Sequence, residues 1–276
     1  MKFVEKYDII YQFYGMNNKV MVFCMSDNKY KIKYHAFSVI GNTRQDNEDN
    51  VFCNGVSRGI EDEGVFSCHG EFESDNNILL AVFDGMGGGE KGELASSMSA
   101  EKAKEFSFQG DNPQERLLDY IKEINRDVHS LATTNGYENM GTTFAGVLFT
   151  QDKMIVGNVG DSKIFAVTGG KTKQLSLDHS LPEELAFHNI ITQYIGMDEN
   201  SKEFSPEISQ YDYNQGTKLV ICSDGLTENL SPEQIGALCY VAESVSDASD
   251  ILVSQALTLG GNDNISVIVC EITEST

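Results

Sequence analysis

The 276-residue sequence lacks the features that mark several classes of protein. No apolar run approaches the roughly 18 residues that a membrane-spanning helix needs. The first ten residues, MKFVEKYDII, carry Glu5 and Asp8 where a signal peptide has an unbroken apolar stretch. There are no internal repeats and no low-complexity tracts. We therefore expect a cytoplasmic protein that does not associate with membranes.

Basic residues are also scarce. The chain has 20 Lys and Arg against 42 Asp and Glu, which gives a formal net charge of −22. A negative field of this size repels a phosphate backbone, so nucleic acid is not an expected partner. The acidic excess does not by itself indicate metal binding, because most of these carboxylates belong to a solvated surface.

Cysteine and histidine do not occur at metal-binding spacings. The six cysteines form no C-x-x-C pair, and the five histidines form no H-x-x-H or H-E-x-x-H arrangement. Cys222 and Cys270 end the apolar runs LVIC and VIVC, which predicts buried free thiols. Ser223 precedes Asp224 without a surrounding G-x-S-x-G, so a serine-hydrolase site is not indicated.

The order of apolar and polar segments predicts an α+β domain over residues 34–276, preceded by an N-terminal extension over residues 1–33. Helices are predicted at about 91–108, from about 113, at 231–243 and at 246–259. Strands are predicted at 34–41, 78–83, 142–150, 153–160, 162–170, 172–177, 218–223 and 265–272. Several of them follow one another through short turns, which favours antiparallel pairing. Residues 54–77 form an inserted loop or hairpin in this interpretation, and 178–207 is irregular.

Acidic residues recur at the ends of the predicted core strands. They are Glu48, Asp49, Asp84, Asp161, Asp224 and Asp263. Oxygen ligands from several chain segments are what Mg²⁺ and Mn²⁺ prefer. Taken singly, each aspartate is more often a turn residue than a metal ligand, because Asp bonds its own backbone and Gly tolerates positive φ. Only their convergence in the fold would make them a metal site.

A glycine cluster offers a competing interpretation. Residues 87–92 satisfy the dinucleotide pattern G-x-G-x-x-G after a predicted strand and before a helix. However, a second helix and antiparallel strands follow, so no βαβ unit is expected. Lys91 is followed by Gly92 and not by Ser or Thr, which excludes a Walker-type phosphate loop.

Eight short motifs, taken in order, resemble those of the PPM-type (2C-type) protein phosphatases, with a bacterial-like Met86 where many eukaryotic members have histidine. They are Arg44–Asp49, Val82–Gly88, Gly92–Ser96, Gly141–Thr143, Asn158–Lys163, Asp178–Ser180, Ser223–Gly225 and Gly261–Asn264. The resemblance covers about residues 34–272. It implies a four-layer α-β-β-α sandwich of two antiparallel sheets flanked by helices.

The resemblance also implies a site with two Mn²⁺ or Mg²⁺ ions. Asp84 would bridge the ions, and the Gly85 carbonyl would be a ligand. Glu48 would bind one ion, while Asp224 and Asp263 would hold the other.

Three further residues receive roles from the resemblance. Asp161, with Asp224, would support a third and weaker ion. Asp49 would lie behind the ligands, and Arg44 would grip the substrate phosphate. The implied reaction is hydrolysis of phosphoserine or phosphothreonine in phosphoproteins by a metal-activated water. The partners would be proteins phosphorylated by a serine/threonine kinase.

Two departures from the family pattern are visible. Met86 leaves protonation of the leaving serine oxygen without an assigned residue, and the segment after Asp178–Ser180 is short. The short segment, together with the unusual N-terminus, leaves open a catalytically weak or inactive member of the same fold that acts as a regulatory or binding module. A dinucleotide-binding protein that uses Gly87, Gly89 and Gly92 is the second alternative.

Overall fold

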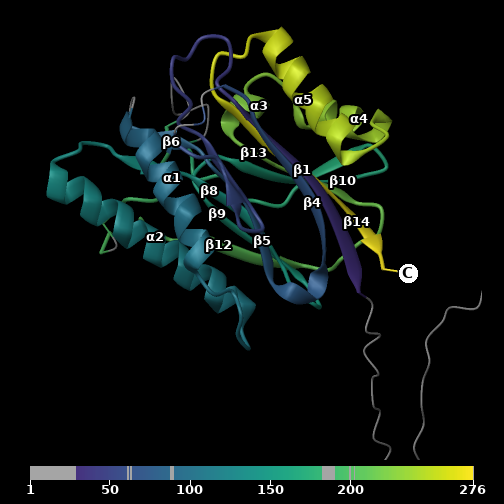
Figure 1. Cartoon of the computed structure of the whole chain (residues 1–276), viewed down its shortest axis with the longest axis horizontal. Helices are drawn as coiled ribbons and strands as arrows, with labels where there is room; N and C mark the ends of the chain where they lie inside the picture. The colour runs from purple at the N-terminus through teal and green to yellow at the C-terminus, as the bar shows by residue number, and fades with distance from the viewer. Residues whose placement is uncertain are drawn as a thin grey trace, which may run out of the picture.

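Two six-stranded sheets pack face to face in the computed structural model, and helices cover both outer faces (Figure 1). The structure describes residues 29–60, 62, 64–87, 90–181, 190–198, 200–201 and 203–275. Within this part of the chain, every strand pairing is antiparallel. This is the predicted four-layer α-β-β-α sandwich.

The first sheet joins the two ends of the described chain. Its strands, in spatial order, are β11 (Lys171–Gln174), β10 (Lys163–Thr168), β13 (Lys218–Cys222), β14 (Ile265–Glu274), β1 (Tyr30–Val39) and β4 (Phe66–Glu73). β1 pairs along its whole length with β14, from Tyr30 opposite Glu274 to Val39 opposite Ile265. The segments that follow β1 and precede β14 are therefore brought to the same end of the sheet.

The second sheet contains, in spatial order, β12 (Glu207–Tyr211), β9 (Met154–Val159), β8 (Phe144–Phe149), β5 (Ile78–Phe83), β2 (Asn50–Cys53) and β3 (Val56–Ser57). A separate ribbon pairs β6 (Gly85–Met86) with β7 (Gly141–Thr142). Without a parallel pair in the described residues there is no βαβ unit, so the glycine cluster lacks the setting of a dinucleotide site. Gly88 and Gly89 lie outside the described residues.

Two helices cover each outer face, and local sequence accounts for their bounds. The outer face of the second sheet carries α1 (Glu90–Glu105) and α2 (Pro113–Asn135), while the first sheet carries α4 (Pro232–Val241) and α5 (Val245–Leu259). Asn112 caps α2 by accepting from the Glu115 N–H, and Ser231 and Gln234 form a capping box at α4. The short helices η1 (Ser74–Asn76) and α3 (Asp224–Thr227) follow β4 and β13.

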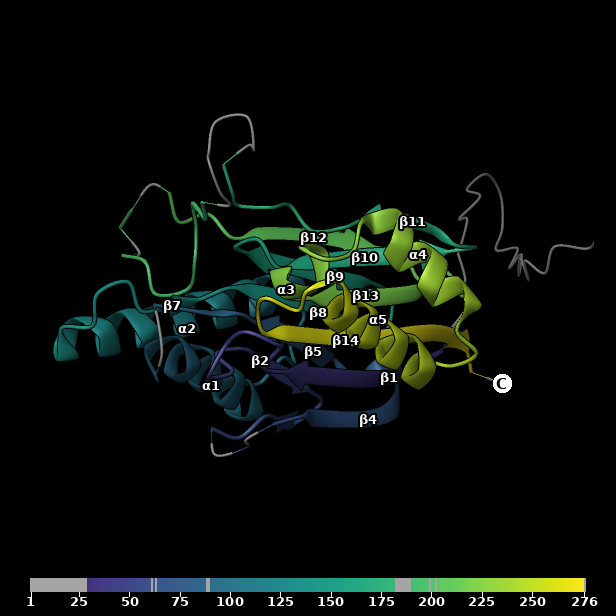
Figure 2. The same ribbon diagram turned by 90° about the horizontal axis from the view of Figure 1, so that it is seen from above.

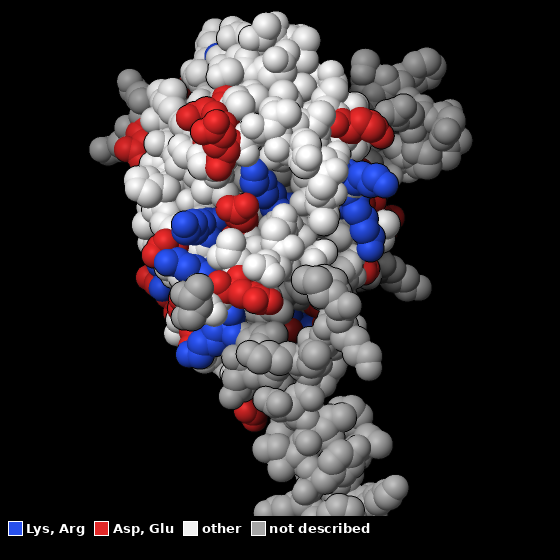
Figure 3. Space-filling model, turned by 90° about the vertical axis from the view of Figure 1, so that its right-hand side faces the viewer, with Lys and Arg blue, Asp and Glu red and all other residues white. Residues whose placement is uncertain are grey.

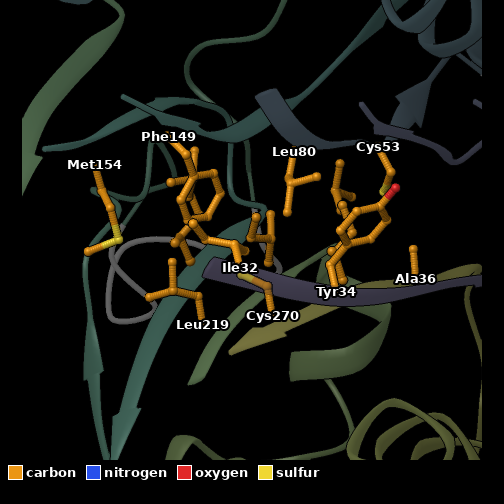
Figure 4. Close-up of a cluster of buried hydrophobic side chains, with 14 of the residues drawn as sticks. Ile32, Tyr34, Ala36, Cys53, Leu80, Phe149, Met154, Leu219 and Cys270 are labelled. Carbon is orange, nitrogen blue, oxygen red and sulfur yellow. The ribbon is translucent and has the colours of Figure 1, made fainter. Parts of the chain in front are cut away.

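The main core lies between the two sheets (Figure 4). Ile32 and Leu219 come from the first sheet, and Leu80 and Phe149 come from the second. The five described cysteines are free, and four of them are buried, as the apolar runs predicted. Burial raises the pKa of the Cys270 thiol to about 12, so this side chain packs in the core as an unreactive thiol.

Some elements differ from the expectation. β1 begins at Tyr30, so four residues assigned to the N-terminal extension belong to the sheet; residues 1–28 lie outside the described residues. The insertion at 54–77 supplies β4, which pairs with β1 at the edge of the first sheet. The strands β2 and β12 and the helix α3 were not anticipated, because each is five residues or shorter.

No helix in the described part of the chain is both long enough and apolar enough to cross a membrane. On the face shown in Figure 3, acidic and basic side chains are interspersed and form no continuous basic patch.

Candidate metal centre and active site

The predicted acidic residues lie at one end of the sandwich, where several core strands end. β1 and β13 both run antiparallel to β14, so their last residues meet the start of β14. β5 and β9 are likewise both antiparallel to β8. The short elements β6 and α3 continue from β5 and β13 at this end of the sheets (Figures 1 and 2). Antiparallel pairing therefore gathers acids that are far apart in sequence.

The loop after β1 is tied to the segment before β14. The Asn264 side chain accepts from the Glu48 N–H at 2.9 Å and donates to the Asp46 carbonyl at 2.9 Å. Asp49 is 1% exposed and accepts a hydrogen bond from the Ser223 hydroxyl at 2.8 Å. Ser223 thus supports a buried carboxylate, which agrees with its exclusion as a nucleophile.

The backbone of Asp84 is held by the Gly141–Thr143 segment. The Asp84 N–H donates to Thr143 Oγ1 at 3.0 Å, and the Thr143 N–H donates back to the Asp84 carbonyl at 2.8 Å. The Thr142 hydroxyl donates to the same carbonyl. Thr143 Oγ1 also lies 2.7 Å from the hydroxyl oxygen of Ser162, next to Asp161. A chain of hydrogen bonds therefore links the backbone of Asp84 to the turn that carries Asp161.

Glycine is required where β6 passes the loop and helix α1. A Cβ on Gly85 would lie 2.4 Å from the carbonyl oxygens of Glu48 and Gly92. A Cβ on Gly92 would lie 2.9 Å from the Glu48 carboxyl carbon and from its Oε1. Positions 85 and 92 therefore leave no room for a larger residue, and the Glu48 carboxyl lies beside Gly92.

The Asp161 turn is packed against the Asp178–Ser180 segment. The His179 N–H donates to the Gly160 carbonyl at 2.9 Å, and the Gly160 N–H donates to the His179 ring at 3.2 Å. Lys163 forms an ion pair with Asp178 at 3.1 Å. The Asp178–Ser180 motif therefore supports the turn, and residues 182–189 of the following short segment lie outside the described residues.

The clustered carboxyls shift one another's protonation. Burial, followed by the charge of Asp49, raises the pKa of Asp84 well above its ordinary value. Burial is also the largest cause that raises the pKa of Glu48, Asp49 and Asp161, each to about 7. Asp224 adds to the increase at Asp161. Without cations, this set resists full ionisation at neutral pH.

One direct contact limits the repulsion within the site, because Arg44 Nη2 lies 2.6 Å from Asp263 Oδ2. After burial and the charge of Asp49, the charge of Asp224 also raises the pKa of Asp84, so the two carboxyls lie close enough to affect each other's protonation. In this arrangement, no three Asp, Glu, His or Cys side chains of the described residues are placed around one point as a metal would require.

The donor set nevertheless fits a hard cation. Glu48 Oε1 and Asp161 Oδ1 are buried carboxylate oxygens without a hydrogen-bond partner among the described residues. A buried acceptor left unsatisfied is costly, and a cation satisfies it. All the candidate ligands are oxygens, the type that Mg²⁺ and Mn²⁺ select. A bound cation would also lower the raised pKa values of these carboxyls, because positive charge favours their ionised forms.

The predicted residues Arg44, Glu48, Asp49, Asp84, Gly85, Asp161, Asp224 and Asp263 all contribute to this end of the fold. The sequence did not single out the supporting roles of Asn264, Ser223 and Thr143, although each lies inside a quoted motif. It gave no role to Arg58, which lies in the insertion and reaches the same loop.

Comparison with known proteins agrees with this geometry. The family model described as protein phosphatase 2C matches residues 67–258. The protein phosphatase PhpP of Streptococcus pneumoniae is 31% identical over 215 residues, which cover 71% of this chain and 86% of that protein. The structure of the S. agalactiae serine/threonine phosphatase matches with a TM-score of 0.73 and 28% identity. It covers 87% of this chain and 99% of that one.

A further structure, the catalytic domain of the serine/threonine protein phosphatase PstP in complex with two manganese ions, matches with a TM-score of 0.70. At 24% identity over 88% of this chain and 99% of that one, it supports the fold alone. The family match and the relative at 31% identity carry the assignment. The chain belongs to the protein phosphatase 2C family and is a protein serine/threonine phosphatase of its bacterial-like branch.

Proposed function

We propose that the carboxylate cluster is a divalent-cation centre that serves the dephosphorylation of phosphoserine and phosphothreonine in proteins. Asp84 and the Gly85 carbonyl would bind at the middle of the centre, with Glu48 on one side and Asp224 and Asp263 on the other. The observation that carries this proposal is the convergence of these acids from four separate segments. The unsatisfied Glu48 Oε1 adds to it.

Mn²⁺ and Mg²⁺ are the proposed cations. The oxygen-only donor set supports both, and the two manganese ions of the PstP structure support Mn²⁺. Asp161 would serve a third, weaker ion together with Asp224, because its buried Oδ1 lacks a partner and its pKa responds to Asp224. Asp49 would remain behind the ligands, where the Ser223 hydroxyl already orients it.

Arg44 is the proposed binding group for the substrate phosphate. The Arg44 side chain is 49% exposed, so it can turn toward a ligand without opening an empty cavity in the core. A guanidinium fork matches two phosphate oxygens at once. Asp263 pairs with this guanidinium, so a cation bound at Asp263 would compete with Arg44 for the carboxylate.

The cations, when bound, would supply Lewis acidity and a water of lowered pKa near neutral pH. The chain itself contributes three things. The acids remain fixed through the Asn264, Ser223 and Thr143 contacts, Arg44 neutralises phosphate oxygens, and close glycine contacts leave no space beside Glu48 for another side chain. The substrates would be proteins modified by a serine/threonine kinase.

Hydrolysis of a phosphothreonine peptide in EDTA, in Mg²⁺ and in Mn²⁺ tests the proposal. We expect no phosphate release in EDTA and full recovery when either effective cation is added in excess. Release that persists in EDTA would contradict the metal requirement. A folded protein that releases no phosphate with any cation would instead favour the inactive regulatory module.

A further inference from the structure

The insertion at 54–77 carries an arginine that is almost fully buried. Arg58 follows β3 directly and is 2% exposed, and it is the bulkiest of the fully buried side chains in the described residues. A guanidinium out of water is unfavourable unless its donors are bonded and its charge is paired. The hydrogen-bond and ion-pair partners of Arg58 therefore indicate its structural role.

Arg58 bonds mainly to backbone carbonyls of one loop. Its Nε donates to the Asp49 carbonyl at 3.0 Å, and its Nη2 donates to the Asn47 carbonyl at 2.5 Å. Nη2 also pairs with Glu93 Oε1 of α1 at 2.9 Å, and Nη1 donates to the Asp62 carbonyl at 3.3 Å. One side chain thus connects the insertion, helix α1 and the loop that follows β1.

The two carbonyls that Arg58 holds flank Glu48. The carbonyl of Glu48 itself accepts from the Ser96 hydroxyl of α1 at 2.6 Å. Three consecutive carbonyls, at Asn47, Glu48 and Asp49, are therefore each held by a side chain from outside the loop. Peptide groups bonded in this way hold the backbone of Glu48 in place, which fixes the point from which its side chain leaves the loop.

The backbone on either side of Arg58 adds to the same attachment. The Arg58 N–H donates to Asn50 Oδ1 at 3.1 Å, and the Asn50 side chain donates to the Arg58 carbonyl at 3.0 Å. Asn50 is the first residue of β2, directly after Asp49. The Arg58 side chain therefore bonds the carbonyls of Asn47 and Asp49, and the Arg58 backbone bonds the Asn50 side chain at the end of the same segment.

We propose that Arg58 is a positioning residue for the cation centre: by bonding the carbonyls on both sides of Glu48, it fixes the direction of the Glu48 carboxylate. The inference rests on the proposed function, since it concerns the affinity of that centre. It assigns a role to the insertion, which reaches the loop of Glu48 through Arg58. Glu93 supplies the counter-charge that lets the guanidinium stay buried.

Lysine can replace arginine only in part in this role. The guanidinium reaches the two carbonyls and Glu93 from one planar fork, whereas an ammonium is a point charge on a flexible stem. Residues that orient metal ligands change metal affinity by about 10–100-fold when they are mutated. We expect Arg58→Met to weaken Mn²⁺ binding within that range and Arg58→Lys to weaken it less.

The test compares Arg58→Met and Arg58→Lys with Arg116→Met. Arg116 is a matched control, because it also donates twice to a backbone carbonyl, that of Ser107, and pairs with an acid, Asp119, but lies on α2. Mn²⁺ affinity is measured by calorimetry on each protein, and metal-free thermal unfolding shows that each is folded. Phosphopeptide kcat and KM are then measured across a Mn²⁺ titration.

We expect Arg58→Met to need at least 10-fold more Mn²⁺ for half-maximal activity, with KM for the peptide within twofold of wild type, since Arg44 is untouched. Saturating Mn²⁺ should recover most of kcat, and the control should match wild type. If Arg58→Met does not fold, Arg58→Lys decides the question by the same titration. Wild-type Mn²⁺ affinity in the folded Arg58 variants would overturn the inference, whereas a wild-type protein that binds no Mn²⁺ would overturn the proposed function first.

Discussion

Arg44 and Asp263 form an ion pair of 2.6 Å between a proposed phosphate-binding group and a proposed metal ligand. The two residues are 219 positions apart and are brought together by the pairing of β1 with β14. If Asp263 binds a cation and Arg44 binds phosphate, as proposed, each of these events would compete with the ion pair between the two residues.

Replacing Arg44 separates these two effects. Arg44→Met should raise KM for a phosphothreonine peptide by about 10–100-fold, the value of a lost charge-assisted hydrogen bond. It should not weaken Mn²⁺ binding, because the competitor for Asp263 is gone. Steady-state kinetics and calorimetry measure the two quantities on the same sample. A variant with unchanged KM and weaker Mn²⁺ binding would refute both assignments.

Removal of Asp224 should abolish activity and leave the fold intact. Asp224→Ala loses a proposed ligand, so kcat/KM should fall by at least about 100-fold at a Mn²⁺ concentration that saturates wild type. The metal-free variant should melt no lower than wild type, because a carboxyl has left a mutually repulsive cluster. Asp212→Ala, at a side chain that is 82% exposed, is the acidic control and should keep full activity. Wild-type turnover in Asp224→Ala would disprove this ligand assignment.

The metal-free protein should lose stability as pH rises through the range where the cluster ionises. The pKa of Asp161 is raised to about 7 in the folded state, against about 4 in an unfolded chain. Between these values the folded state holds a proton that the unfolded state has released. Its contribution to stability is therefore present below about pH 4 and lost as pH approaches 7.

Thermal unfolding in EDTA from pH 5 to pH 8 measures this effect, with Asp161→Asn as the reference that cannot ionise. We expect the melting temperature of wild type to fall relative to Asp161→Asn as pH increases. Added Mn²⁺ should raise the wild-type melting temperature more at pH 8 than at pH 5, since protons compete for the same oxygens. Parallel pH profiles for the two proteins would count against the raised pKa.

Gly92→Ala should damage the site while favouring the helix that carries it. Alanine in place of glycine inside α1 favours helix by about 1 kcal/mol. The new Cβ, however, would lie 2.9 Å from the Glu48 carboxyl carbon and Oε1, so Glu48 must move. We expect a folded protein with weaker Mn²⁺ affinity by calorimetry. Lys91→Ala, one residue earlier in α1, should bind Mn²⁺ like wild type, and equal affinities in both variants would show that Glu48 tolerates displacement.

Local sequence patterns predicted most of the long elements, because their signals are local. The apolar run at 78–83 became β5 with the predicted bounds, and the helical spacing of Leu117, Ile121 and Ile124 marks the buried face of α2. β2 and β12 were not predicted, because four or five residues carry too little periodicity. The 54–77 segment was predicted only as an inserted loop or hairpin, and the place of β4 depends on its pairing with β1.

The acidic candidates were predicted from their positions and from a family resemblance, but their direct contacts were not. No local signal in the sequence indicates that Arg44 forms an ion pair with Asp263. Arg58 was missed for the same reason. In sequence it is an ordinary residue of a polar insertion, and its role arises from the carbonyls that surround it.

The sequence by itself determined the types and order of the long elements, the family, and the set of acids available to a cation, since these follow from periodicity, turn chemistry and short motifs. The tertiary structure alone decided which acids lie close together, which oxygens are left unsatisfied, and that a buried arginine from the insertion holds the Glu48 loop. The physical reason is that burial and charge interactions depend on distance in space. Antiparallel pairing across more than two hundred residues sets those distances here.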